Sequence, residues 1–279
     1  MKNISFAKMS GAGNDFILIK KSQIPNIVLT NIVISQLCNR RNGIGADGII
    51  IIKNTQGYDF AMDYYNSDGS SGTLCGNAAR CAIKFANDTG ITDSDSVSFI
   101  SNEVEFSGEL LVNGLIKLNL QPPKVIDENI MIDVDGSNVS GSYVDTGSPH
   151  VVLIVDDLNL QPVVQTGKEI RYNPAFAPGG TNVNFIKFIN GKIHIRTYER
   201  GVENETLACG TGAVAAAIIG FRKFEIQPPI FLLTKGGDEL IVNFNTDGSK
   251  FSNVSLTGPA KKIYNGEIGI NFFNQTNGE

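Results

Sequence analysis

Short apolar runs separated by turns rich in glycine, asparagine and aspartate make up most of the chain. Many runs are rich in β-branched side chains, which is typical of β-strands. The continuous run at residues 48–53 predicts a buried strand, whereas the alternation at residues 59–65 and 192–199 predicts strands with one buried face. Further strands are predicted at residues 16–20, 151–155 and 183–189.

Three stretches predict helices instead. The first is residues 31–39, and the other two, residues 75–85 and 209–221, are rich in small apolar residues and contain no proline. Both of the latter begin with a Cys-Gly pair, so Cys75 and Cys209 are each predicted at a helix N-terminus. Residues 97–120 and 230–256 read as short strands split by Gly, Asn and Asp turns, which predicts hairpins.

The two halves of the chain repeat the same order of elements. A shift of 134 residues aligns Cys75-Gly76 with Cys209-Gly210 and, without a gap, several other identical residues. Such internal similarity indicates a duplicated structural unit. The predicted fold class is therefore α+β, with two similar domains, each a bent sheet around a central helix, and an active site in the interdomain cleft.

The composition indicates an ordered protein with enough residues for two hydrophobic cores. It has 279 residues, of which 42% are hydrophobic and 18% charged. The net charge of -5 argues against nucleic-acid binding, which needs a basic surface. The apolar runs are shorter than the ~20 residues of a membrane helix, and the first residues lack the pattern of a signal peptide. We expect a cytoplasmic protein without membrane or nucleic-acid partners, and the sequence leaves a homodimer open.

Two of the four cysteines stand where acid–base chemistry is favoured. Backbone N–H groups at a helix N-terminus are unpaired, so they lower the pKa of a thiol there and bind anions. If the copies pack around a pseudo-twofold axis, Cys75 and Cys209 would face opposite sides of one substrate carbon. One thiol could then remove a proton and the other return it on the opposite face, which inverts a stereocentre without a cofactor. Cys38 and Cys81 have no repeat partner and are predicted to be structural.

Two other interpretations fit these patterns less well. No CxxC or HxxxH spacing accompanies Cys75 or Cys209, which argues against a metal site. The Gly11-x-Gly13 segment lacks the third glycine, the preceding strand and the following helix of a dinucleotide-binding loop.

Several longer motifs run along the whole chain. The first half contains FAKMSGAGNDF at residues 6–16, RNGIGADG at 41–48, NSDGS at 66–70 and CGNAARC at 75–81. The second half contains TGSPH at residues 146–150, TNVNF at 181–185, YERG at 198–201 and ACGTG at 208–212. In this order they resemble the diaminopimelate epimerases of bacterial lysine and cell-wall biosynthesis.

The resemblance implies an isomerase that interconverts LL-2,6-diaminopimelate and meso-2,6-diaminopimelate without pyridoxal phosphate or any other cofactor. It implies that Cys75 and Cys209 act as thiolate base and thiol acid and exchange these roles with the direction of reaction. It also implies that a C-terminal strand at residues 267–273 returns to the first domain. The expected domains are residues 1–122 with about 265–279, and residues 123–264.

The same motifs carry over the family's substrate contacts. Backbone contacts to the reacting carboxylate are implied for Gly76, Asn77, Gly210 and Thr211. Polar contacts to the rest of the substrate are implied for Asn14, Asn66, Asn182 and Arg200. Of these, Arg200 suits a bidentate contact with the distal carboxylate. Glu199 is expected to bind a substrate ammonium and, together with His150, to poise the cysteines for activity.

The sequence departs from the family pattern at two positions. Ser148 stands where many members have asparagine, and Gly48 stands where many have glutamine. Serine can still donate one hydrogen bond, so Ser148 is kept as a substrate contact, whereas Gly48 offers no side chain and is left out. A water in place of the missing side chain, or a different substrate preference, would both be compatible with Gly48.

Two alternative functions remain open at this point. A proline or hydroxyproline racemase uses a similar two-cysteine fold, but Arg200, Asn66 and Asn182 favour a longer, doubly charged substrate over a ring, which would need an apolar pocket. The other alternative is a non-catalytic amino-acid-binding protein, in which the duplicated halves only enclose a ligand.

Overall fold

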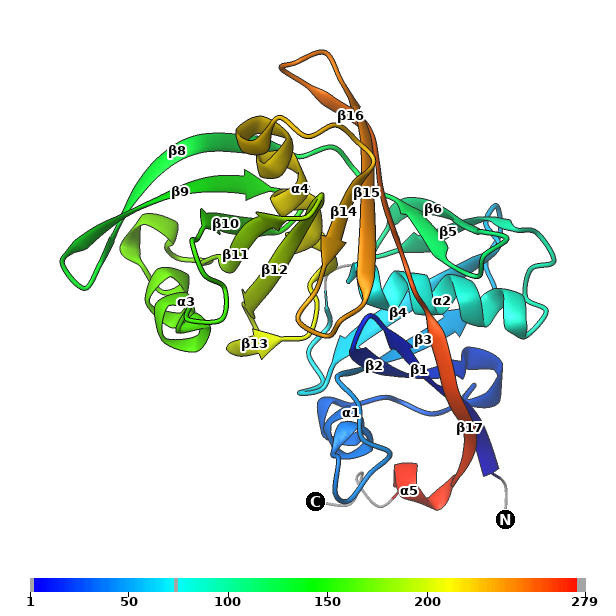
Figure 1. The fold of residues 1–279 in the computed structure, drawn as a ribbon. Helices are drawn as coiled ribbons and strands as arrows, with labels where there is room; N and C mark the ends of the chain where they lie inside the picture. Colours follow the sequence, from blue (N-terminus) through cyan, green and yellow to red (C-terminus); the bar gives the residue numbers. More distant parts are fainter. Residues whose placement is uncertain (1–2, 73–74, 275–279) are drawn as a thin grey trace. The chain divides into compact units, whose positions relative to one another are not determined.

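Strands form most of the secondary structure, and the α+β prediction is confirmed (Figure 1). The structure is a computed structural model that describes residues 3–72 and 75–274. It divides into two compact units: the first is Met1–Leu118 with Pro259–Glu279, and the second is Asn119–Gly258. Among the described residues, no helix combines the length and the apolar character needed to cross a membrane.

The first unit places one helix on each face of its sheet. Alternate side chains of β2 and β3, among them Ile17 and Ile49, pack with Leu37 of α1 in one core cluster. Helix α2 packs against β1, β2, β3, β4 and β6. The elements of this unit are β1 (Asn3–Gly11), β2 (Asn14–Lys20), η1 (Lys21–Gln23), α1 (Asn31–Cys38), β3 (Gly48–Lys53), β4 (Phe60–Asn66), α2 (Gly76–Asp88), β5 (Ser96–Ser101), β6 (Val104–Leu110), β7 (Ile116–Asn119), β17 (Lys261–Gly269) and α5 (Asn271–Asn274).

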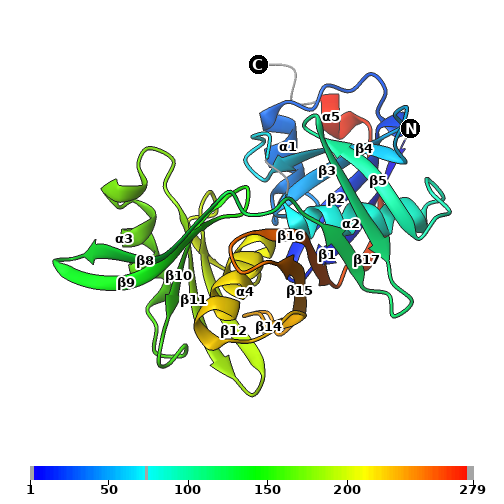
Figure 2. The same cartoon turned by 90° about the horizontal axis from the view of Figure 1, so that it is seen from above.

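The second unit has the same plan. Val163 and Ile170 of α3 pack on Val183 and Phe185 of β11, and α4 packs against β9 to β12 and also against β14 and β15 (Figure 2). The sheet therefore curves around α4. The elements are β8 (Val125–Val134), β9 (Ser137–Asp145), β10 (Pro149–Ile154), α3 (Val163–Arg171), η2 (Pro174–Phe176), β11 (Asn182–Ile189), β12 (Lys192–Glu199), β13 (Asn204–Thr206), α4 (Gly210–Phe224), β14 (Ile230–Leu233), β15 (Glu239–Thr246) and β16 (Phe251–Gly258).

The predicted duplication is confirmed by the strand register. Strands β2 and β3 pair in parallel with Phe16 opposite Gly48, and β10 and β11 pair in parallel with His150 opposite Asn182. Each residue of the second pair lies 134 positions after its counterpart in the first. The parallel pairs β4–β5 and β12–β14 keep the same correspondence.

The C-terminal strand differs from its predicted bounds. It runs as β17 from Lys261 to Gly269 and pairs along β1, from Ser10 opposite Lys261 to Asn3 opposite Gly269. The predicted return of the C-terminal strand to the first unit is confirmed, but the bounds 267–273 are wrong, because the strand ends at Gly269 and Asn271–Asn274 form a helical turn. The second compact unit ends at Gly258, and the first unit resumes at Pro259.

Several elements have no counterpart in the sequence predictions, among them strands β1, β8, β9 and β13 and helix α3. The long hairpin of β8 and β9 carries charged and polar residues and a register irregularity between Asp127 and Ile130, which breaks the expected alternation. Helix α3 contains Gly167, whose position is set by packing. A Cβ atom there would lie 2.4 Å from Cβ of Tyr198, so the helix approaches β12 closely only because this residue is glycine.

Candidate active site

Helices α2 and α4, which occupy corresponding positions in the two units, each begin at a cysteine, as predicted. Cys75 is the N-cap of α2 and Cys209 the N-cap of α4, and both have extended backbone conformations. The carbonyl of each accepts the first helical hydrogen bond, from Ala79 and Ala213 respectively, at 2.9 Å. Cys75 is half-buried, and Cys209 is 8% exposed. In both units the thiol therefore stands beside the first N–H groups of a helix, which have no acceptor within that helix.

The turn between β1 and β2 packs directly on the start of α2. A Cβ atom on Gly11 would lie 2.6 Å from the backbone oxygen of Asn77, so only glycine allows this approach. The turn itself uses Ala12 and Gly13, both with positive φ, which closes a tight hairpin. The Gly11-x-Gly13 motif is thus a close-packing turn against the helix start. The expectation that no strand precedes it is wrong, because β1 ends at Gly11, but a second strand and not a helix follows it.

Side-chain amides fix the first turn of α2. The Nδ2 of Asn77 donates to Oδ1 of Asn14 at 2.5 Å, and its Oδ1 accepts from Nη2 of Arg80 at 2.8 Å. Arg80 is fully buried and also donates to the backbone oxygens of Gly76 and Pro259. Two of the predicted substrate contacts, Asn14 and Asn77, are therefore in direct contact with each other.

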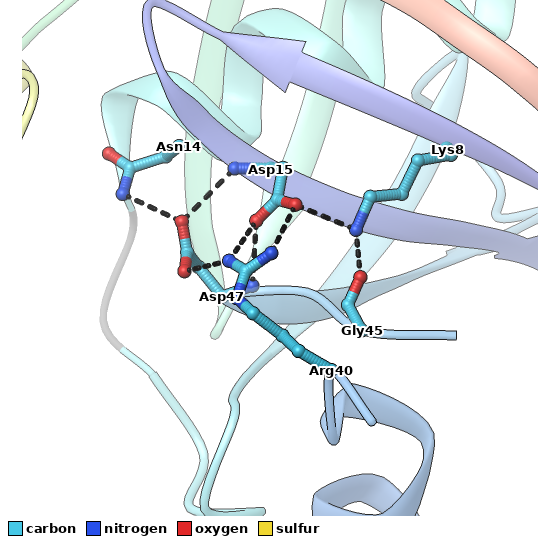
Figure 3. A network of polar contacts seen from close by, with 6 residues as sticks. All are labelled: Lys8, Asn14, Asp15, Arg40, Gly45 and Asp47. Carbon is cyan, nitrogen blue, oxygen red and sulfur yellow. Dashed lines mark hydrogen bonds and ion pairs between the residues drawn. The ribbon is translucent and has the colours of Figure 1, made fainter. Parts of the chain in front are cut away.

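A network of charges continues from Asn14 (Figure 3). Asn14 donates to Asp47 at 3.2 Å, and Arg40 bridges Asp47 and Asp15 at 2.7 Å each. Lys8 lies 2.8 Å from the Asp15 carboxylate. Burial by itself raises the pKa of Asp15, but the hydrogen bonds and charges of Arg40 and Lys8 outweigh it and hold the pKa below its usual range. The network keeps Asp15 ionised and orients Asn14 through Asp47.

Tyr64 occupies the space beside Gly48. A Cβ atom on Gly48 would lie 2.8 Å from the ring of Tyr64 and 2.5 Å from the backbone oxygen of Tyr65. The hydroxyl of Tyr64 donates to Oδ1 of Asn66 at 3.0 Å, and Asn66 in turn donates to Ser70 at 3.0 Å. The glycine that departs from the family pattern thus makes room for an aromatic residue that orients Asn66.

In the second unit, hydrogen bonds connect the buried His150 to the start of α4. The Nε2 of His150 lies 2.9 Å from the hydroxyl of Thr211, and that hydroxyl lies 3.6 Å from Sγ of Cys209. The Nδ1 of His150 lies 3.1 Å from Nδ2 of Asn184. Burial, with a smaller contribution from the charge of Arg200, lowers the pKa of His150 to about 3. The imidazole is therefore neutral near pH 7.

The other predicted contacts of this unit lie at the strand ends beside His150. Asn182 donates to the backbone oxygen of Pro149 and accepts from the backbone N–H of Arg200, both at 2.9 Å. Glu199 accepts from the hydroxyl of Thr206 at 2.9 Å. Ser148 lies in the turn before β10, where its backbone oxygen accepts from Thr146 at 3.1 Å.

Arg200 lines a hollow of about 450 Å³ in the second unit. Tyr143 and Phe176, whose rings stack with centroids 6.0 Å apart, line it together with Asp127. The guanidinium donates to the backbone oxygen of Gly179 at 3.2 Å. Because Cys209 is not among the lining residues, the hollow marks the surroundings of Arg200 and not those of the thiol.

The two remaining cysteines are buried. Cys38 and Cys81 are 4% and 0% exposed, and burial raises the pKa of each thiol to about 12. Both therefore stay protonated near neutral pH and are poor nucleophiles. Among residues 3–72 and 75–274, no group of three His, Cys, Asp or Glu side chains is arranged to hold a metal ion.

Sequence reasoning missed two polar residues of these regions. Asn184 is fully buried near the start of β11, and Arg80 is fully buried in helix α2. Each is a polar residue at a position where the pattern calls for an apolar one, and buried polar groups are retained where they have hydrogen-bond partners. A polar residue at a predicted apolar position was therefore the sequence feature that could have identified Asn184 and Arg80.

Comparisons with known proteins agree over nearly the whole chain. The family model "Diaminopimelate epimerase" matches residues 6–113 and 142–263. The diaminopimelate epimerase of Aquifex aeolicus is 38% identical over 277 residues, covering 95% of this chain and 98% of the relative. That of Chlorobaculum tepidum is 39% identical over 263 residues, covering 93% of this chain and 99% of the relative.

Solved structures with much lower sequence identity share the fold. A phenazine biosynthesis protein of the PhzF family from Bacillus anthracis superposes with a TM-score of 0.75 at 14% identity, covering 97% of this chain and all of that one. A probable proline racemase from Agrobacterium radiobacter superposes with a TM-score of 0.71 at 15% identity, covering 96% and 93%. These two likenesses support the two-unit duplicated fold alone.

Proposed function

The chain belongs to the diaminopimelate epimerase family and is an isomerase, and we propose that it interconverts LL-2,6-diaminopimelate and meso-2,6-diaminopimelate. The reaction would supply lysine and peptidoglycan precursor biosynthesis in the cytoplasm. Relatives named diaminopimelate epimerase that are 38% and 39% identical over nearly the full chain support this proposal.

The observation that carries the mechanism is the pair of cysteine N-caps on the repeated helices α2 and α4. We propose that Cys75 and Cys209 act on the same α-carbon. The thiolate of one takes the α-proton and becomes a thiol, while the thiol of the other gives its proton to the opposite face and becomes a thiolate. One proton is taken up and one is released, so the pair ends with its roles exchanged and no cofactor is needed.

The helix starts would stabilise the charge that develops during this exchange. When the α-proton leaves, negative charge spreads from the carbon onto the adjacent carboxylate. Backbone N–H groups at Gly76, Asn77, Gly210 and Thr211 are the proposed donors to that carboxylate, because they belong to the first turns of α2 and α4.

The remaining polar residues are proposed to bind the distal end of the substrate. Arg200 supports this role because it lines a hollow together with Asp127, so groups of both charge signs border the same space. Asn14, Asn66, Asn182 and Ser148 would add amide and hydroxyl contacts. The Glu199 carboxylate would accept a hydrogen bond from a substrate ammonium group. His150 would act on Cys209 through the Thr211 hydroxyl.

Solvent deuterium exchange tests the proposal directly. Purified protein incubated with LL-diaminopimelate in D₂O should incorporate deuterium at the α-carbon and form the meso isomer, as followed by NMR. The Cys75→Ala and Cys209→Ala variants serve as matched controls that lack one proton carrier. Absence of label with LL-diaminopimelate would overturn the proposal.

The same assay separates the alternatives. Exchange with L-proline or trans-4-hydroxy-L-proline, and not with diaminopimelate, would indicate the racemase function. Binding of an amino acid without any exchange, and without an effect of thiol alkylation, would indicate a non-catalytic binding protein.

A further inference from the structure

A line of hydrogen bonds in the second unit begins at Asn184, near the start of β11, and ends at the thiol of Cys209. Asn184 and His150 are both fully buried, so their hydrogen bonds cannot be exchanged for bonds to bulk water. The line passes through His150 and the hydroxyl of Thr211. Which group donates and which accepts at each of these hydrogen bonds follows from the donors and acceptors that each residue carries.

The orientation of the Asn184 amide is fixed at both ends. Its Nδ2 lies 3.1 Å from the backbone oxygen of Val151, which can only accept, so the NH₂ group must face that side. Its Oδ1 accepts from the hydroxyl of Thr197 at 2.9 Å. A Cβ atom on Gly212 would lie 2.4 Å from this Oδ1, so the glycine in the first turn of α4 leaves the space that Asn184 fills.

This orientation determines which nitrogen of His150 carries the proton. The NH₂ group of Asn184 also faces Nδ1 at 3.1 Å, so Nδ1 must be the acceptor. A neutral imidazole has one N–H, which therefore lies on Nε2 and donates to the Thr211 hydroxyl at 2.9 Å. The neighbouring residues are uncharged: Val144 lies opposite on β9 and Asn182 opposite on β11. Arg200 supplies the positive charge that opposes protonation of the ring.

The Thr211 hydroxyl then has its own proton to donate. It accepts from His150, and Sγ of Cys209 lies 3.6 Å away on its other side. A hydroxyl that donates to sulfur stabilises the thiolate more than the thiol, because the thiolate is the stronger acceptor.

We propose that Asn184 is a positioning residue that holds His150 as its Nε2–H tautomer, so that the Thr211 hydroxyl donates to Cys209 and favours its thiolate in the free enzyme. This line of hydrogen bonds, which we call the relay, transfers no proton. It orients the Thr211 hydroxyl so that this group donates to the sulfur of Cys209. The inference rests on the proposed role of Cys209 as a proton carrier, but it can be tested without turnover.

The first test reads the tautomer itself. In ¹⁵N-labelled protein at pH 7, the His150 ring should show a protonated Nε2 and an unprotonated Nδ1. Asn184→Asp has nearly the same shape but presents only acceptors, so it should move the proton to Nδ1 or charge the ring. A wild-type ring protonated on Nδ1, or an Asn184→Asp ring that keeps the proton on Nε2 alone, would overturn the assignment.

The second test reads the thiol. In a Cys75→Ser background, the rate of Cys209 alkylation by iodoacetamide is measured against pH, since Cys38 and Cys81 are buried. Thr211→Val should raise the apparent pKa of Cys209 by about one to two units, which lowers alkylation about ten- to hundredfold below that pKa. Thr211→Ser, which keeps the hydroxyl, should restore the original midpoint.

The control for this test is Thr234→Val, which removes another buried hydroxyl of the same unit, one that donates to the backbone oxygen of Asp238. It should leave the alkylation midpoint unchanged. An equal midpoint for Thr211→Val and the parent protein would overturn the relay. Because neither readout requires diaminopimelate, an inactive protein with an intact relay would count against the proposed function alone.

Discussion

The starts of α2 and α4 have the same backbone but different surroundings. Both begin with a cysteine N-cap in extended conformation followed by glycine. In the second unit, His150 and Asn184 reach the helix start, whereas the residues 134 positions earlier are Phe16 and Ile50. These two are 1% and 0% exposed, and Phe16 packs edge to face on Tyr64 with ring centroids 6.0 Å apart.

The difference shows what the duplication retained and what it changed. Strand register and helix start were kept, and with them the N–H groups that can bind an anion. The supporting side chains diverged: Arg80 and Asn77 hold the first helix start, and His150 with Asn184 holds the second. Two thiols at matching positions can therefore have different affinities for a proton, as the proposed mechanism requires of a pair that starts as one thiolate and one thiol.

The largest expected effect comes from removing either thiol. Cys75→Ala and Cys209→Ala should each lower the rate of inversion about 10³-fold, because each removes one of two proton carriers. Each variant should retain slow deuterium exchange with one diastereomer only, and the preferred diastereomer should differ between the two. Inversion at the wild-type rate by either variant would show that the helix starts are not a functional pair.

The next effect concerns stability and distinguishes the side chains that hold the start of α2 from those that hold the start of α4. Arg80→Met should lower the free energy of unfolding by about 3 kcal/mol, since it removes the charged donor of buried hydrogen bonds to the Asn77 side chain and to the backbone oxygens of Gly76 and Pro259. The counterpart in the second unit is Val214, where Val214→Ala should cost about 1 to 2 kcal/mol by loss of packing alone. Urea denaturation measures both; equal losses would contradict the assigned role of Arg80.

A smaller effect appears as a pH dependence. The pKa of His150 is about 3 when folded and about 6.5 when unfolded, so between these values only the unfolded state binds the proton. Stability should therefore fall as the pH drops below 6.5, by about 1.4 kcal/mol per pH unit from this residue. His150→Phe, which copies Phe16, should remove this component of the slope. An unchanged slope in urea titrations at pH 4.5 to 7 would contradict a buried neutral ring.

The smallest effect is expected at the charge network of the first unit. The Arg40 side chain is 58% exposed, so its pairs with Asp15 and Asp47 are screened by water. Arg40→Lys should cost less than about 1 kcal/mol, and the loss should shrink further at high salt. A loss as large as that of Arg80→Met would mean that the network contributes more to the helix start than its exposure indicates.

Local patterns predicted the elements wherever one segment decides its own conformation. Strands at residues 48–53 and 192–199 and both cysteine N-caps were predicted where they occur. Helix α3 and the hairpin of β8 and β9 were not, because Gly167 depends on its contact with Tyr198 and the β8 ladder is irregular. The roles of Asn184 and Arg80 were missed for the same reason, since their partners are distant in sequence.

The sequence by itself therefore determined the duplication, the α+β class, the family and the two cysteines at helix starts. These follow from spacing and residue type, which are local and repeat along the chain. Only the tertiary structure decided how the two starts differ: that His150 is neutral, that Asn184 orients it, and that Tyr64 fills the space beside Gly48. Burial and hydrogen-bond direction depend on residues brought together by folding, and no single segment contains that information.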